Sequence, residues 1–167
     1  TILGPYATKT QANVNPNHKF GLRLRRNTRL NLYNSIIAGF NTGISLEGPS
    51  MELYNAASGP EIKNCLMAGM VKNFNAKTDG TSLTQAQYET MFNAGNNTLY
   101  AENTELQLTN AWNWGNVNAM PQSGSPALTG ASFTGLTGFE TVTFRGAFGT
   151  QNWAQGWTNW DPVNTNY

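Results

Sequence analysis

Charged side chains are scarce in this sequence. Asp, Glu, Lys and Arg make up 11% of its 167 residues, whereas about a quarter is usual for a soluble domain. The formal net charge is only +1, so the basic excess that nucleic-acid binding needs is missing. Apolar runs are also short, and none approaches the roughly 18 residues of a membrane-spanning helix. The composition therefore predicts no nucleic-acid partner and no membrane span.

Residues that hold metals or drive catalysis are few and dispersed. Cys65 is the only cysteine, which excludes an internal disulfide, and its apolar surroundings predict a buried structural thiol. His18, the only histidine, follows a polar loop beside Lys19, so we interpret it as a surface residue. The aspartates are Asp79 and Asp161, and the glutamates form no pair of the kind that calcium-dependent lyases or glycosidases need. We predict no catalytic residue, no metal site and no cofactor.

Asparagine takes the place of charge, because Asn residues outnumber all charged residues together. Asn tolerates left-handed backbone and hydrogen-bonds its own main chain, so it favours tight turns. An uncharged, turn-rich composition is typical of secreted β proteins. The chain starts at Thr1 in a strand-like phrase with no initiator Met or signal peptide. We therefore expect a fragment or processed product of a protein that is secreted or held at the outer cell surface, in the envelope.

Short phrases recur along the first two thirds of the chain. They combine a glycine or asparagine with alternating or continuous apolar residues, as short strands do. Recurrence at spacings of about 20 to 30 residues is the signature of a repeat architecture. The matching phrases are residues 21–24 with 43–46, 32–34 with 53–55, and 34–39 with 64–69.

This recurrence predicts an all-β fold, a right-handed parallel β-helix (solenoid), in which each turn buries its apolar face on the next. We expect a single domain over residues 1–167 that forms the C-terminal part of a longer β-helix, with the turns in residues 1–143. The predicted core consists of inward positions of the recurring strands: Leu22, Leu24, Leu32, Ile36, Ile44, Leu46, Ile62, Leu66 and Leu99. Asn34, Asn64 and Asn97 precede apolar runs and are expected to form a side-chain ladder at the corners.

One short helix is predicted near residues 84–92, inserted between two turns. Tyr88, Met91 and Phe92 would share one face of it and pack on a sheet. Ser82 or Thr84 supplies a cap at its start, and Gly95 ends it.

The last segment, residues 144–167, is aromatic, rich in glycine and not periodic. We predict that it is a C-terminal cap over the apolar cross-section that the last turn exposes. The alternative is a sugar-stacking platform formed by Trp153, Trp157 and Trp160, with Trp112 and Trp114 as further members of the aromatic group. The N-terminal edge has no such cover, so we expect it to pair with upstream turns of the same parent protein or with a second copy of the chain.

Arginines are concentrated in one predicted strand. Arg23 and Arg25 alternate with Leu22 and Leu24, which places them on the outer face. That face could receive an anionic glycan or a lipid headgroup, although we favour a solvated face that discourages edge pairing. The candidate ligand-binding residues of the chain are therefore Trp153, Trp157, Trp160, Arg23 and Arg25.

Several phrases resemble a known family. Residues 144–149 (Phe-Arg-Gly-Ala-Phe-Gly), Trp153 and residues 156–162 (Gly-Trp-Thr-Asn-Trp-Asp-Pro) closely resemble the C-terminal end of a family of secreted or outer-membrane-associated Bacteroidetes proteins. Residues 24–27, 34–39 and 125–133 resemble it as well, so the resemblance covers most of the chain. It implies the C-terminal portion of a longer right-handed parallel β-helix of mostly unknown function, and no catalytic residues.

Three functions remain possible. The first is a non-catalytic structural or adhesive β-helix segment of a secreted or cell-envelope bacterial protein. The second is the closing turns of a carbohydrate-active β-helix enzyme whose active site lies upstream. The third is a glycan-binding module that meets an extracellular glycan through surface tryptophans. The dispersed carboxylates favour the first.

Overall fold

The computed structural model describes residues 1–54, 59–75 and 82–166. Asp79, one of the two aspartates, and Asn55, the end of one predicted repeat phrase, lie outside these ranges. Within them the chain forms short strands in four small sheets, one α-helix and three 3-10 helices. The elements are β1 (Ile2–Leu3), β2 (Phe20–Arg25), β3 (Leu32–Tyr33), β4 (Ile36–Ala38), β5 (Thr42–Glu47), η1 (Pro49–Leu53), β6 (Ile62–Lys63), β7 (Leu66–Ala68), β8 (Lys72–Asn75), α1 (Gln85–Ala94), β9 (Thr98–Tyr100), η2 (Asn103–Leu106), β10 (Leu108–Asn110), β11 (Asn118–Pro121) and η3 (Pro126–Leu128).

Three of the four sheets are parallel. Their strand orders are β1-β4-β7-β9, β2-β5-β8 and β3-β6, whereas β10 and β11 pair antiparallel. Two of the repeats seen in the sequence appear directly in the pairing, because Leu22 lies beside Ile44 and Ile36 beside Leu66. The third was misread, since Leu32 pairs with Ile62 and not with Leu53.

The prediction of a single right-handed parallel β-helix over residues 1–143 is wrong. The strands are two to six residues long and fall into separate small sheets, with a helix and an antiparallel pair among them. Two causes are visible. Left-handed glycines, Gly39 and Gly69, end β4 and β7 after three residues, and stacking in that sheet stops at β9. Beyond β9 the chain turns into η2, and Leu108 pairs antiparallel with Pro121.

Asparagine and glycine form the corners of the β4 and β7 segments. Asn34 and Asn64, two residues before β4 and β7, have φ of 51° and 55°, and Gly39 and Gly69, just after these strands, have φ of 72° and 63°. Such angles favour Gly and Asn. The predicted asparagine ladder is only partly right, because the third corner is Asn96, whose amide donates to the Asn64 oxygen (2.8 Å). Asn97 instead accepts a hydrogen bond from the Cys65 N–H (2.7 Å).

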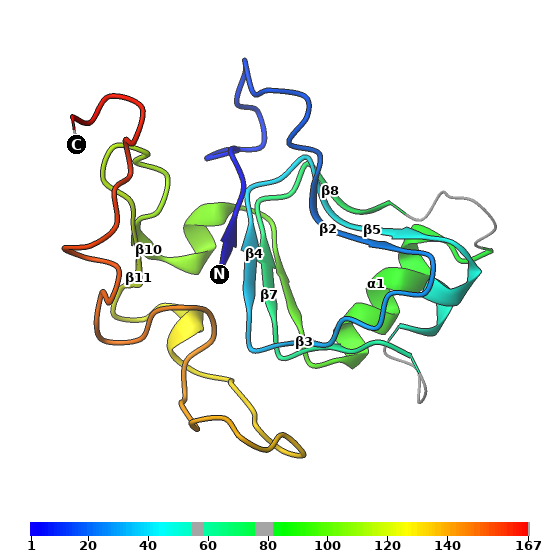
Figure 1. Ribbon diagram of the computed structural model, residues 1–167. Coiled ribbons are helices and arrows are strands. Elements are labelled where there is room, and N and C mark those ends of the chain that lie inside the picture. Colours follow the sequence, from blue (N-terminus) through cyan, green and yellow to red (C-terminus); the bar gives the residue numbers. More distant parts are fainter. Residues whose placement is uncertain (55–58, 76–81, 167) are drawn as a thin grey trace.

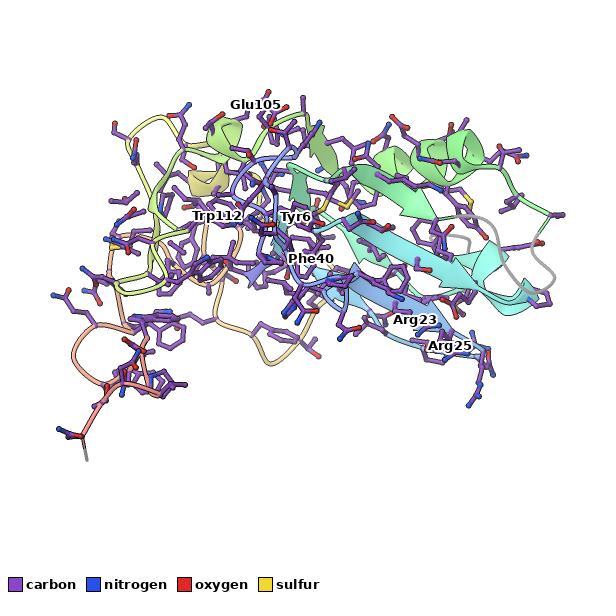
Figure 2. All side chains as sticks on the ribbon, turned by 90° about the horizontal axis from the view of Figure 1, so that it is seen from above. Tyr6, Arg23, Arg25, Phe40, Glu105 and Trp112 are labelled. Carbon is purple, nitrogen blue, oxygen red and sulfur yellow. The ribbon has the colours of Figure 1, made fainter. Side chains whose placement is uncertain are left out.

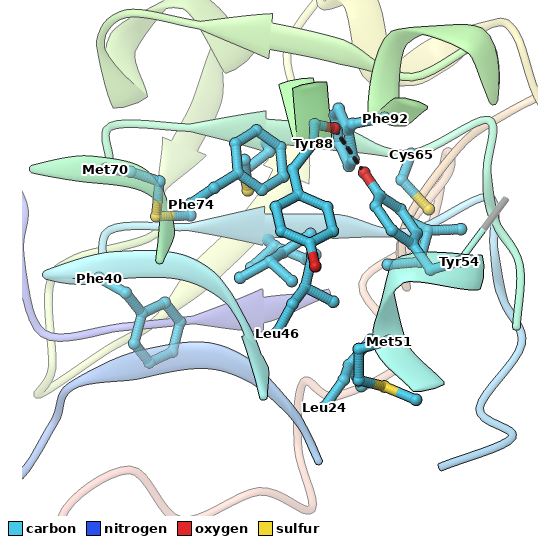
Figure 3. Packing of buried hydrophobic residues seen from close by; sticks show 14 residues of the cluster. Leu24, Phe40, Leu46, Met51, Tyr54, Cys65, Met70, Phe74, Tyr88 and Phe92 are labelled. Carbon is cyan, nitrogen blue, oxygen red and sulfur yellow. Dashed lines mark hydrogen bonds between the residues drawn. The ribbon is translucent and has the colours of Figure 1, made fainter. Parts of the chain in front are cut away.

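The core consists of two clusters on opposite faces of the sheet β1-β4-β7-β9. The larger one contains Ile37, Ile44, Phe74 and Phe92, and Figure 3 shows its packing. The smaller one contains Ile36, Leu66, Leu106 and Ala127. All nine predicted core residues lie in the core or pack against it. Six are buried: Leu24, Ile36, Ile44, Leu46, Ile62 and Leu66. The other three are half-buried and pack against the larger cluster: Leu22, Leu32 and Leu99. The single common core that was predicted is thus divided by a sheet.

Helix α1 lies where the sequence predicts it. Thr84 caps its start through a capping box with Gln87, and Gly95 follows its end. Tyr88 and Phe92 are buried, and Phe92 meets Phe74 of β8 edge to face, with ring centroids 5.5 Å apart. In the same cluster the Tyr54 hydroxyl donates to the Tyr88 carbonyl (2.8 Å; Figure 3).

Figure 1 shows two halves on either side of the sheet β1-β4-β7-β9. The strand half holds the sheets β2-β5-β8 and β3-β6 with α1, and it encloses the larger cluster. The loop half holds β10, β11 and the tail to residue 166. The tail lies beside the first strand: the Ala147 N–H donates to the Thr1 hydroxyl (2.8 Å), and the Gly146 N–H donates to the Asn34 carbonyl (2.7 Å).

Candidate ligand-binding groove

The exposed tryptophans of the loop half line a common groove. Trp114, Trp153, Trp157 and Trp160 surround a hollow of about 420 Å³, with Leu3 of β1 in its wall. The four side chains are 47%, 54%, 70% and 39% exposed. Because large apolar side chains normally bury most of their surface, such a concentration marks a contact surface. The remaining lining residues are small or apolar: Thr1, Val117, Ala119, Ala147, Phe148, Ala154 and Thr158.

Three of the rings form a continuous stack along one wall. Phe148 stacks on Trp153 with ring centroids 5.2 Å apart, and Trp153 stacks on Trp157 at 5.8 Å. The four-residue spacing of the two tryptophans corresponds to a turn, in which the Thr158 N–H donates to the Ala154 carbonyl (3.2 Å). The Trp153 indole N–H donates to the Ala147 carbonyl (2.6 Å), and the Trp157 indole N–H donates to the Trp153 carbonyl. Both rings are therefore held in place while their surfaces remain accessible.

Backbone contacts just before the stack fix its position. Gly146 has φ of 94°, and a Cβ there would lie 2.7 Å from the Ile36 side chain. The neighbouring Arg145 is buried and donates to the Pro126 carbonyl (2.9 Å), while its main-chain N–H donates to the Ala127 carbonyl (2.7 Å). Burial lowers the pKa of the Arg145 guanidinium. The tail is thus attached through residues 145–147, and Trp153 adds one hydrogen bond to this segment.

A second hollow with amide-rich walls adjoins the groove. It measures about 310 Å³ and shares Val117, Ala154, Thr158 and Trp160 with the groove. The rest of its lining is polar, and most of it is amide: Thr109, Asn110, Asn116, Asn118, Asn152 and Gln155. Within the described chain, the side-chain amides of Asn110, Asn116, Asn152 and Gln155 hydrogen-bond to no other residue. Each amide offers both donors and acceptors.

The predicted arginine pair does not join this groove. Arg23 and Arg25 lie on β2, on the side of the molecule away from α1 (Figure 2). Both bind Glu47 of β5, with Nε–Oε distances of 2.7 and 2.6 Å. The Arg23 hydrogen bond, with help from the Ser45 hydroxyl and Arg25, keeps the pKa of Glu47 below its usual range. Both arginines thus bind a carboxylate of the neighbouring strand on this face of the sheet.

The carboxylate of Glu61 is also held by neighbouring groups. Glu61 is bound by Lys63 (2.5 Å) and by the Tyr33 hydroxyl, which lowers the pKa of its carboxyl group and raises that of Tyr33 to about 12. A general acid needs the opposite shift. No group of three or more His, Cys, Asp or Glu side chains suited to a metal ion occurs among the residues described. Cys65 is buried, as predicted, and burial raises its pKa to about 11.

Sequence reasoning found part of the groove and missed the rest. Trp153, Trp157 and Trp160 are brought together as the platform hypothesis requires, and their exposure favours it over the cap. Trp114 belongs with them, whereas Trp112 packs against the smaller core cluster and donates its indole N–H to the Gly4 carbonyl (3.0 Å). The amides carried no signal, because asparagine is common throughout the chain. The tail lies beside both β1 and β11, which no local pattern could indicate.

Comparison with protein-family models, with curated proteins and with solved structures finds no significant match to this chain. The resemblance to the Bacteroidetes family stays a prediction on that ground. Across the described ranges, the longest helix is far too short and too polar to cross a membrane.

Proposed function

We propose that this chain is a non-catalytic carbohydrate-binding module, which attaches its parent protein to a glycan through the tryptophan groove. The observation that carries the proposal is the junction between the aromatic groove and the amide hollow, which share four residues. A sugar ring has an apolar C–H face and a rim of hydroxyl groups. The groove offers aromatic surface for the face, and the hollow offers donors and acceptors for the rim.

The chemistry of the lining favours a sugar over other ligands. Ligand sites combine mostly apolar walls with a few placed polar groups, in volumes of about 300–1,000 Å³. Among the described residues, neither hollow has a charged side chain in its wall, so a highly charged ligand such as a nucleotide would meet no charged side chain there. A bound metal would find no carboxylate or imidazole. Hydroxyl-rich neutral surface is the chemistry that fits both hollows.

A glycan-binding role agrees with an adhesive function at the outside of a cell. An extracellular glycan is the partner that such a module would meet, and secretion or attachment to the envelope is where it would act. The lowered pKa values of Glu47 and Glu61 keep both carboxylates ionised, so neither is suited to donate a proton as a general acid.

Affinity electrophoresis tests the proposal. The purified chain is run through native gels that contain soluble polysaccharides: β-glucan, xyloglucan, galactomannan, polygalacturonate and alginate. We expect retardation by at least one of them, and Trp157→Ala should weaken the affinity about tenfold or more, which corresponds to about 1.4 kcal/mol. Phe139→Ala is the matched control, because Phe139 is equally exposed (66%) but lies outside the groove.

Mobility that no polysaccharide of the panel changes would contradict the proposal. So would retardation that Trp157→Ala and Phe139→Ala reduce equally, since the binding surface would then lie elsewhere. Release of reducing sugar during incubation with the retarding polysaccharide would contradict the non-catalytic part alone.

A further inference from the structure

The tryptophan groove continues into another hollow on two sides. On one side lies the amide hollow, which shares four residues with it. On the other side lies a hollow of about 280 Å³, called the proline hollow below, which shares Leu3 and Trp114 with the groove. The other residues that line the proline hollow are Gly4, Pro5, His18 and Phe40. Among the described residues, the amide and proline hollows have no lining residue in common, so the groove lies between them.

This arrangement determines how a glycan chain fits the groove. A site for the end of a chain is closed beyond the terminal ring, because it has to reject a chain that continues. The groove continues at both junctions instead, with Trp160 at the amide hollow and Trp114 at the proline hollow. A sugar ring held by the tryptophans therefore has space for a neighbouring ring on either side.

The path through the three hollows is uncharged. In the parts of the chain that the structure describes, no Asp, Glu, Lys or Arg side chain lines any of them. The polar side chains at its two ends are mainly amides in one hollow and the His18 imidazole in the other, and both kinds of group donate and accept hydrogen bonds. An ionised ligand would lose part of its hydration there and meet no Asp, Glu, Lys or Arg in return, which is unfavourable.

On the basis of the proposed function, we propose that the ligand is a neutral, linear polysaccharide, bound by an internal stretch of its chain. This stretch runs from the amide hollow through the tryptophan groove to the proline hollow. The tryptophans contact the faces of the central sugar rings. The amides bind the hydroxyl groups of the ring on one side, and His18 binds those of the ring on the other side, with Pro5 as apolar surface next to it.

Isothermal titration calorimetry with oligosaccharides of different lengths tests this inference. The probes are the di-, tetra- and hexasaccharides of β-1,4-linked glucose, mannose and xylose, and the hexasaccharide of galacturonic acid is the charged comparison. In at least one neutral series, we expect the affinity to rise about tenfold from the di- to the hexasaccharide, because the outer hollows add hydrogen bonds. The galacturonic acid hexasaccharide should bind more weakly than the best neutral one, because its carboxylates lose hydration.

The stoichiometry on a long polymer distinguishes internal stretches from chain ends. The soluble polysaccharide of the best neutral series is titrated with the protein to saturation. We expect several copies of the protein on each polymer chain, because one chain offers many internal stretches and only two ends.

Two variants test the outer hollows separately. Gln155→Ala in the amide hollow and His18→Ala in the proline hollow should each lower the affinity for the neutral hexasaccharide about fivefold, the loss of one net hydrogen bond. Both should leave the affinity for the disaccharide unchanged, because the tryptophans hold it. The matched controls are Gln122→Ala and Asn17→Ala, at exposed amides outside the three hollows. Far-ultraviolet circular dichroism checks that all four variants keep the fold.

The two proposals fail in different ways. Equal affinity for di- and hexasaccharides, or a single copy of the protein per polymer chain, overturns the internal stretch; if Trp157→Ala abolishes this binding, the binding module stands. An effect of only one of Gln155→Ala and His18→Ala overturns the path through both outer hollows. Tighter binding of the galacturonic acid hexasaccharide than of every neutral one overturns the neutral ligand. Failure of all oligosaccharides to bind, together with no retardation in the polysaccharide gels, overturns both proposals.

Discussion

The strand half and the loop half of this molecule are stabilised by different means. In the strand half, equivalent apolar residues stack across parallel strands, as Ile44 does between Leu22 and Phe74. In the loop half, side chains hold the main chain: the Ser125 hydroxyl donates to the Leu106 carbonyl (2.6 Å), and the Asn103 amide to the Tyr6 carbonyl (2.7 Å). Only the second arrangement leaves large aromatic side chains free for a ligand.

The buried residues that stabilise the fold are therefore different from the exposed residues of the proposed binding site. The strand half contributes most of the buried apolar side chains, which dominate folding free energy. The groove residues bury less and are positioned by a few hydrogen bonds at residues 145–147. Substitutions in the two halves should consequently affect different measurements, and the predictions below test that separation.

The largest loss of stability is expected for Phe74→Ala. Phe74 is fully buried between β8 and α1, so the truncation leaves a cavity that should cost about 3–5 kcal/mol. Val71→Ala, at a neighbouring half-exposed site, should cost less than about 1 kcal/mol. Urea denaturation followed by tryptophan fluorescence and circular dichroism measures both, and similar midpoints for the two variants would contradict the assigned core.

A pair of glycine substitutions probes the contact between the central sheet and η2. Gly69 has φ of 63°, and a Cβ there would lie 2.0 Å from the Asn103 amide of η2. Gly135 has φ of 77° but open space around it. Both Ala variants should lose about 1 kcal/mol of unfolding free energy, because the left-handed backbone conformation disfavours Ala. Only Gly69→Ala should lose about 1–2 kcal/mol more, because its Cβ displaces Asn103.

Equal destabilisation of the two glycine variants would show that Asn103 does not pack tightly against Gly69. The same denaturation curves decide this, and Asn103→Ala serves as the control, because the extra cost of Gly69→Ala should largely vanish in that background.

A moderate effect is expected from acid. The folded-state pKa of Glu47 is lowered, chiefly by the Arg23 hydrogen bond. Its contribution to stability should therefore be complete above the unfolded-state pKa of about 4.3 and be lost as the pH falls through the lower folded-state value. The free energy of unfolding, measured from neutral pH to about pH 3, should fall less steeply in Glu47→Gln than in the wild type. Parallel pH profiles would argue against the ion cluster on β2.

The smallest change in stability is expected for Trp157→Ala. Its indole is 70% exposed, so we expect less than about 0.5 kcal/mol from the truncation. A loss of 2 kcal/mol or more would show that the tail acts as a cap, as the glycine- and aromatic-rich sequence of residues 144–167 first indicates.

The sequence predicts the local elements better than their assembly. Helix α1 follows from Thr84, Gly95 and the face of Tyr88 and Phe92, because capping and helical periodicity are local signals. The pairing of β4 with β7 follows from a repeated phrase. The end of stacking at β9 could not be predicted, because it depends on which partner Leu108 finds in the folded chain.

The same distinction applies to the groove. Three of its four tryptophans stand within eight residues of each other, so their proximity is a local property of the tail. Leu3, Trp114 and the amide hollow come from distant segments that only the folded chain brings together.

The most direct test of the tryptophan groove is a titration followed through the indole N–H signals in a ¹H–¹⁵N correlation spectrum. Trp112 is an internal reference, because it packs against the smaller core cluster, outside the groove. With the polysaccharide oligomer that binds best, we predict saturable shifts of the Trp114, Trp153, Trp157 and Trp160 signals and an unchanged Trp112 signal. Binding that leaves these four signals in place, or shifts Trp112 equally, would contradict the account.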